Sequence, residues 1–322
     1  MKACSYKVYP NNFFNPTDID IVQNDVTEKY VLYKANFRNI RDLHAFLDSN
    51  PKVNKRVFPN LASLENDSHF AGIPYDEAVE ALIKPIRNEY DGLIQLERRL
   101  DHFGSGVTTI YEPCRSAGGA VLDVPRYVSR NPMCYISERE VESPKFIRIN
   151  VALSYSQSTG RKQVENRAII LIALLNALER EDFAVDVNTF SLSYSKEELI
   201  NINVNMKNTD NTINKSSLTK VMCYIEFLRR ILFRVVECMD VKERSWGRAY
   251  GSVCSKEMTK KVLNLSDKEI YFDQPNAIGI RGVNIINDFE NAVEKLGISN
   301  LIDVNESKRN LEREVKRLNL TK

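Results

Sequence analysis

The chain has 322 residues, of which 43% are hydrophobic and 27% are charged, and these proportions exclude disorder along most of its length. Its 45 Lys and Arg residues almost balance its 43 Asp and Glu residues. The resulting net charge of +2 gives no global electrostatic reason to bind nucleic acid or an anionic membrane.

The cysteines and the apolar runs indicate a cytoplasmic protein. Six cysteines are scattered along the chain without a CxxC pair, as is typical of reduced thiols. Residues 1–10 contain no apolar stretch of signal-peptide length. The longest apolar run, residues 168–175, is far shorter than the roughly 20 residues that a membrane span needs, so we expect no membrane partner.

Residues 1–144 predict an N-terminal α+β region. Residues 29–37 alternate between apolar and polar side chains in the manner of a strand. Residues 74–100 have the apolar spacing of a long helix, which Pro85 should kink. Glycines and prolines between residues 104 and 132 predict loops and turns.

Residues 145–300 predict an α/β core domain, and residues 301–322 predict a charged C-terminal helix. The expected core elements are strands at 146–155, 183–194 and 199–206 and helices at 164–181 and 218–239. The first of these helices is apolar on every side and should be buried. This order of elements favours a mostly parallel sheet with flanking helices, of a Rossmann-like or related kind.

Ser154 and Ser156 follow the first core strand, at the end of the sheet where open α/β folds bind ligands. With the strand order, they resemble the von Willebrand factor A fold, in which an Asp-x-Ser-x-Ser turn binds a divalent cation. Ala152 stands where the Asp would be, so the main charge that holds a hard cation is missing. The resemblance implies a von Willebrand A-like core without a metal, while the plain alternative is a polar turn that caps the buried helix.

A second resemblance concerns the segment before the core. Residues 118–127 are Gly-Gly-Ala-Val-Leu-Asp-Val-Pro-Arg-Tyr, and residues 131–134 are Asn-Pro-Met-Cys. Together with residues 70–78, they resemble an uncharacterised family of tailed-bacteriophage proteins, over roughly residues 30–240. The resemblance implies a phage origin and a bacterial host cytoplasm, but no reaction. By composition alone, the segment is typical of a rigid crossing between two domains.

Two groups of residues are candidates for binding a partner. Arg244, Trp246, Arg248 and Tyr250 form a loop suited to anchor a protein interface or to stack nucleic-acid bases, unless Trp246 is buried beneath the loop. Arg229, Arg230 and Arg234 form a basic stripe on the second core helix. This stripe is suited to a nucleic acid or another acidic partner, or else it is the solvated edge of a buried helix.

Catalytic motifs are absent from the sequence. It contains no GxxxxGK[ST], GxSxG, HExxH or GxGxxG pattern. His102, beside Asp101 and with Asp123 further along, is the best acid–base candidate. No two histidines have the helical spacing of metal ligands.

Three functions are compatible with these observations. The leading hypothesis is a phage-encoded, non-enzymatic protein-interaction or assembly protein that needs no cofactor. The second is a nucleic-acid-binding protein acting in phage replication or transcription. The third is an enzyme of an unrecognised type. The sequence names no protein partner and leaves homo-oligomerisation open.

Overall fold

The computed structural model describes residues 17–23, 26–64, 72–83, 114–116, 121–122, 124–132, 135–137, 145–156, 158–181, 183–206, 218, 221–222, 224–266 and 269–317. Within these residues, seven strands form one mixed sheet in the order β1-β2-β8-β7-β6-β10, with the short β9 paired to β7. The bounds are β1 Thr17–Gln23, β2 Val26–Phe37, β6 Lys145–Ala152, β7 Phe183–Ser195, β8 Glu198–Asn205, β9 Ser252–Val253 and β10 Ile270–Phe272.

The strand directions confirm the α/β class but not the predicted parallel sheet. β6 is parallel to β7 and β10, and β2 is parallel to β8. The pairs β1–β2, β7–β8 and β7–β9 are antiparallel, so the prediction of a mostly parallel sheet is wrong. Lys196 and Glu197 alone connect β7 to β8, and such a short connection joins only antiparallel strands. Lys196 has a φ of 52°, in the left-handed region that tight hairpins use.

The sheet includes strands from both sides of the boundary predicted at residue 145. β2 pairs with β8 from Val31 opposite Glu198 to Phe37 opposite Val204. The first two strands therefore belong to the core sheet. Tyr33, Ala35 and Phe37 of β2 enter the main core with residues of β6 to β8, and Ile21 of β1 packs on the other face of the sheet. The division of the chain into three domains otherwise stays a prediction.

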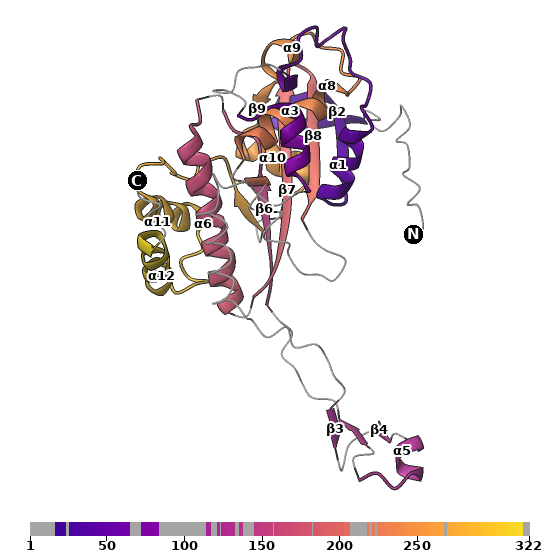
Figure 1. Cartoon of the computed structure of the whole chain (residues 1–322), viewed down its shortest axis with the longest axis vertical. Helices are drawn as coiled ribbons and strands as arrows, with labels where there is room; N and C mark the ends of the chain where they lie inside the picture. Colours follow the sequence, from indigo (N-terminus) through magenta and orange to yellow (C-terminus); the bar gives the residue numbers. More distant parts are fainter. Residues whose placement is uncertain are drawn as a thin grey trace.

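One face of the sheet is covered by helices. The bounds are α1 Ile40–Asp48, η1 Ala62–Leu64, α3 Tyr75–Ala81, α6 Arg161–Arg180, η3 Phe227–Leu232, α8 Phe233–Glu237, α11 Ile285–Leu296 and α12 Val304–Arg317. The predicted burial of the first core helix is confirmed, because fourteen residues of α6 are buried. α11 and α12 pack against the outer side of α6 (Figure 1).

The other face is covered in part by α10, Lys256–Leu263. Met258 and Val262 of this helix form a second apolar cluster with Ile21, Phe190 and Leu192 of the sheet. This cluster occupies the half of the face near the carboxyl ends of β6 and β7. The other half of the face carries polar side chains and forms a pocket, described below.

A small antiparallel sheet lies apart from the core in Figure 1. It consists of β3 Cys114–Ser116, β4 Val121–Leu122 and β5 Tyr135–Ser137, and α5 Val124–Val128 follows β4. The segment that resembles phage proteins thus contains a short strand and a helical turn. None of the described helices has the length and the hydrophobicity that are needed to cross a membrane.

The close approach of residue 57 to the short helix α9, Trp246–Ala249, gives a test of the fold. A Cβ on Gly247 would lie 2.0 Å from the carbonyl oxygen of Val57. We expect Gly247→Ala to lower the free energy of unfolding by about 1–3 kcal/mol, because the backbone must move apart. Urea denaturation measures this change.

Gly160→Ser is the matched control for Gly247→Ala. The nearest atom to a Cβ on Gly160 is 3.9 Å away, and serine is a good residue at the start of a helix such as α6. This variant should be as stable as the wild type. Equal stability of Gly247→Ala and Gly160→Ser would contradict the packing of residue 57 on α9.

Candidate functional site

The polar half of the second sheet face is lined by asparagines. Asn201, Asn203 and Asn205 alternate along β8 with apolar residues that enter the main core. Asn36 of β2 pairs in register with Asn203, and Asn188 of β7 pairs with Asn205. Carboxamide side chains from three adjacent strands therefore lie side by side on one surface.

A pocket of about 540 Å³ lies over this surface, a volume within the range of ligand sites. We define the amide pocket by Asn36, Arg148, Asn150, Asn188, Asn203 and Asn205. It lies at the amino ends of β6 and β7. Open α/β sheets usually bind ligands at the carboxyl ends of their strands, so the pocket is at the opposite end from the predicted turn.

The pocket amides are bonded to one another but keep unused hydrogen-bonding capacity. Asn203 Nδ2 donates to Asn36 Oδ1 at 2.8 Å, and Asn188 Nδ2 donates to Asn150 Oδ1 at 3.2 Å. Asn150 Nδ2 donates to Glu269 Oε2 at 2.5 Å. Each carboxamide has two N–H donors and an oxygen that accepts two bonds, so these contacts use only part of what is present.

Two amide oxygens in the asparagine row of β8 are buried without a partner among the described residues. They are Oδ1 of Asn201 and Oδ1 of Asn203. A buried acceptor that lacks a donor costs about 1–3 kcal/mol. Of these two residues only Asn203 lines the pocket, so the carboxamides that line the pocket, rather than these buried oxygens, form the candidate binding site.

The charges at the pocket are compensated. Arg148 Nε lies 3.0 Å from Asp186 Oδ2, and Arg148 Nη1 lies 4.0 Å from Glu269 Oε1. Arg38, at the pocket edge, pairs with Asp42 at 2.8 Å. The two arginines are thus matched by carboxylates, and the pocket does not present the surplus positive charge that a phosphate needs.

The turn predicted to resemble a cation site is instead positively charged. Ser154 is buried, with its Oγ 2.8 Å from Ser191 Oγ, and Ser156 Oγ lies 2.7 Å from Ser158 Oγ. The Arg167 guanidinium donates to the carbonyl oxygen of Ala152. Burial lowers the pKa of Arg167 to about 10, which leaves it charged at neutral pH.

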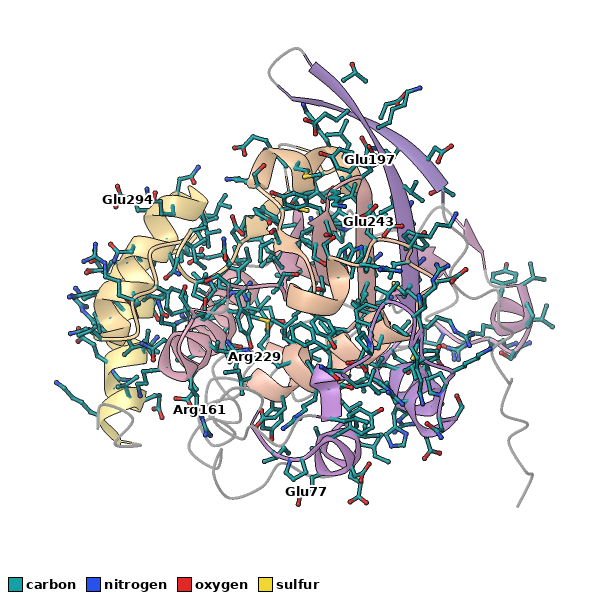
Figure 2. The ribbon with its side chains drawn as sticks, turned by 90° about the horizontal axis from the view of Figure 1, so that it is seen from above. Glu77, Arg161, Glu197, Arg229, Glu243 and Glu294 are labelled. Carbon is teal, nitrogen blue, oxygen red and sulfur yellow. The ribbon has the colours of Figure 1, made fainter. Side chains whose placement is uncertain are left out.

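The structure does not place the predicted basic stripe on the surface. Arg229, Arg230 and Arg234 are only 5%, 2% and 7% exposed, and Figure 2 shows Arg229 in the interior. Arg230 donates to the carbonyl oxygens of Ser63 and Ile73, each at 3.1 Å. Buried charges require such partners. These partners come from a segment about 160 residues earlier, so the helix sequence alone gave no sign of them.

The neighbouring carboxylate of Glu237 is fully buried and lies within reach of four donor atoms from three residues. It accepts from Ser63 N at 3.1 Å, from Ser63 Oγ at 2.6 Å and from Tyr250 OH at 2.6 Å. Arg234 Nη1 completes the set at 3.4 Å. Glu237 therefore connects η1, α8 and the loop that contains Tyr250.

Trp246 is also fully buried, as in the plain alternative to an exposed anchor. Its Nε1 donates to Glu198 Oε2 at 2.9 Å, and Tyr33 OH donates to Glu198 Oε1 at 3.2 Å. Tyr250 is buried as well, with its ring stacked on Phe233 at a centroid distance of 4.1 Å. These residues hold the loop to the core rather than offer it to a partner.

The remaining predicted site residues are either exposed or outside the part of the chain that the structure describes. Arg244 is exposed, and the side chain of Arg248 lies outside what the structure describes. Asp101, His102 and Asp123 also lie outside the described residues, so the acid–base hypothesis stays a prediction. Among the described residues, no group of three or more His, Cys, Asp or Glu side chains is placed to hold a metal ion.

Sequence reasoning missed three carboxylates and the asparagine row. Glu198, Glu226 and Glu237 are buried acid groups, and no spacing along the chain distinguishes them from surface glutamates. The row had a visible signal, because residues 200–205 are Ile-Asn-Ile-Asn-Val-Asn. That alternation predicts a strand with one apolar and one amide face.

The helical turn α5 exposes a group of apolar side chains. Val124, Tyr127 and Val128 are 59%, 58% and 75% exposed, and no residue of α5 is buried. Their i, i+3 and i+4 spacing places them on one side of the turn. We call these three residues the α5 patch.

A comparison with protein-family models gave one match. The model described as "Domain of unknown function (DUF7192)" matches residues 21–300. The chain belongs to this family. The match includes the amide pocket and the α5 patch, but the DUF7192 description brings no reaction or partner with it. For this DUF7192 chain, neither the search of curated proteins nor the search of solved structures found a match.

The buried carboxylate of Glu237 gives a direct test of the charge network. We expect Glu237→Ala to lower the free energy of unfolding by about 3–5 kcal/mol, because Arg234 and Ser63 lose their buried acceptor. Chemical denaturation of the purified protein measures the change.

Glu243→Ala is the control for a surface ion pair. Glu243 pairs with exposed Lys196 at 2.7 Å, and such pairs contribute at most about 1 kcal/mol. If both variants lost the same small amount of stability, Glu237 would not be the buried acceptor described above.

Proposed function

We propose that this DUF7192 protein is a non-enzymatic protein-interaction protein that contacts its partner through the α5 patch. The observation that carries the proposal is the exposure of Val124, Tyr127 and Val128 on one side of α5. Contiguous exposed apolar side chains mark sites of protein–protein contact. The position of this small unit apart from the core in Figure 1 leaves room for a partner around it.

The partner that best complements the patch has an apolar groove with an acidic rim. Valine and tyrosine side chains lose water-exposed apolar area when they enter such a groove, which favours association. Arg130, exposed just after α5, adds a positive charge that a carboxylate at the rim complements. An assembly of several proteins is the proposed setting.

The proposal includes a von Willebrand A-like core without a metal. The chain order β6, α6, β7, β8 and then η3–α8 supports this type of core. The guanidinium of Arg167 at the carboxyl end of β6 supports the metal-free form. Phage origin is part of the same proposal, and the segment that resembles phage proteins includes the α5 patch.

Nucleic-acid binding is the weaker alternative. Its principal candidates, Arg229, Arg230 and Arg234, are buried and bonded within the protein. A protein that binds phosphates through surface arginines would lose affinity steeply with salt. Salt-sensitive binding of DNA or RNA by the purified chain would restore this alternative.

Photo-cross-linking tests the α5 patch. A photoreactive benzoylphenylalanine replaces Val124 in the tagged full-length protein, which is irradiated in cells that naturally produce it. We expect adducts with one defined protein, and adding Val128→Asp should reduce them at least tenfold, because a carboxylate at the contact opposes burial.

Val283 is the matched control, because it is 89% exposed but lies on the core outside the patch. The same photoreactive residue at position 283 should give no comparable adduct. Equal adducts from both positions, or adducts that Val128→Asp does not reduce, would contradict the proposal. Adducts with a second copy of the chain would identify that copy as the partner.

A further inference from the structure

We infer that the amide pocket binds the main chain of an extended polypeptide segment, which lies along β8. This site is separate from the α5 patch and uses a different chemistry. It would recognise a partner segment by its backbone amides, with little dependence on the segment's side chains.

The spacing of the asparagines fits an extended chain. Asn203 and Asn205, the two β8 asparagines that line the pocket, are two positions apart on the strand. A strand rises about 3.3 Å per residue, so these side chains recur about every 6.6 Å along the sheet. An extended peptide presents the N–H and C=O groups of one of its edges at this same interval. Each second residue of a bound segment would therefore meet a carboxamide.

The chemistry of the row also fits a peptide backbone. A carboxamide side chain donates and accepts as a peptide bond does, so each can pair with one backbone N–H and one backbone C=O. Asn36 beside Asn203 and Asn188 beside Asn205 place further amides across the row.

Other ligand classes fit the pocket less well. Arg38 and Arg148 are paired with carboxylates, so a phosphate or a nucleic-acid backbone finds no surplus positive charge. Bases bind on exposed aromatic rings, but Phe37, which also borders the pocket, is 2% exposed and belongs to the main core. Phe146, beyond the pocket on β6, has the guanidinium of Arg148 over its ring, 5.9 Å from the centroid.

These features describe the segment that would bind. The amide side of the pocket is polar and the pocket charges are compensated internally, so an uncharged segment of Gly, Ser, Thr, Asn and Gln fits that side best, while Leu263 and Leu265 supply apolar surface elsewhere in the lining. Charged side chains would have to displace the pairs of Arg148 with Asp186 and Glu269. Large apolar side chains would find no apolar surface in the asparagine row.

An array of blocked dodecapeptides of these five amino acids tests the inference on the full-length protein. The best binder is then measured by fluorescence anisotropy. We expect Asn203→Leu to weaken its binding at least tenfold, and Asn36→Leu serves as a second variant in case Asn203→Leu does not fold. Asn287→Leu, on the exposed side of α11 outside the pocket, should bind as the wild type does.

Backbone methylation then separates main-chain from side-chain recognition. N-methylation removes alternate backbone N–H donors, and methylating one alternate set in the best peptide should weaken binding at least tenfold. Methylating the other set should have a much smaller effect, because those groups face away from the row. Val128→Asp should leave the affinity unchanged, since the α5 patch is not involved.

Three outcomes would overturn the inference. The first is that no peptide of the array binds the wild type more tightly than it binds Asn203→Leu. The second is that both methylated sets bind like the parent peptide. The third is that an oligosaccharide or a nucleotide binds the pocket in an Asn203-dependent manner. None of these outcomes would affect the proposal for the α5 patch, because that proposal is tested by cross-linking at a different surface.

Discussion

The buried carboxylates of Glu226 and Glu237 require hydrogen-bond donors from outside their own helix, and the long-range order of the fold depends on that requirement. Glu237 accepts hydrogen bonds from Ser63 and Tyr250, and Glu226 accepts one from the backbone N–H of Ile73 at 3.2 Å. An unpaired buried charge costs several kcal/mol, so the segment that supplies these donors must lie against the helix in the folded state. Arg230 of the same helix donates in return to the carbonyl oxygens of Ser63 and Ile73.

This exchange explains why residues 54–64 and 72–83 form one structure with the core. A Cβ on Gly72 would lie 2.1 Å from Glu226 Oε1, so only glycine permits this approach of the backbone to the carboxylate. Gly72 also has a φ of 72°, which glycine adopts at little cost. The N-terminal segment is therefore shaped to reach the helix, and β2 enters the core sheet from the same part of the chain.

The two faces of the sheet have different roles. One face is apolar, is covered by α6 and η3–α8, and supplies most of the buried area. The other has an apolar half beneath α10 and an amide half that forms the pocket. Hydrophobic burial accounts for the first face and for the half beneath α10. It does not account for the carboxamides that line the pocket, which is why the pocket is the preferred place for a ligand.

Local patterns in the sequence predicted the helices and strands better than they predicted which residues contact one another. The all-apolar run 168–175 predicted a buried helix, and α6 confirms it, because apolar residues on every side leave no face for water. The antiparallel direction of β8 was missed, although the predicted strands 183–194 and 199–206 lie only four residues apart and such a short connection joins only antiparallel strands. Trp246 is buried with Glu198 as its partner, and Arg230 is buried with Ser63 and Ile73 as its partners, and no local pattern connects these residues.

For the candidate site, the Ile-Asn-Ile-Asn-Val-Asn run predicts a strand with an amide face, but it does not show where in the fold that face lies. Alternation places Asn201, Asn203 and Asn205 on one face of a strand. Only the pairing of β8 with β2 and β7 brings Asn36 and Asn188 beside them. The α5 patch shows the same limit, because exposure depends on what the rest of the chain covers.

Native-state hydrogen exchange at the backbone amides of Ser63 and Ile73 tests most directly whether the buried carboxylates join the N-terminal segment to the core. Both amides donate to these carboxylates. The account predicts that they exchange only through global unfolding, with the same free energy of opening as the central residues of α6. Fast exchange of both amides while α6 stays protected would contradict this prediction, because Ser63 and Ile73 would then separate from the buried carboxylates without global unfolding.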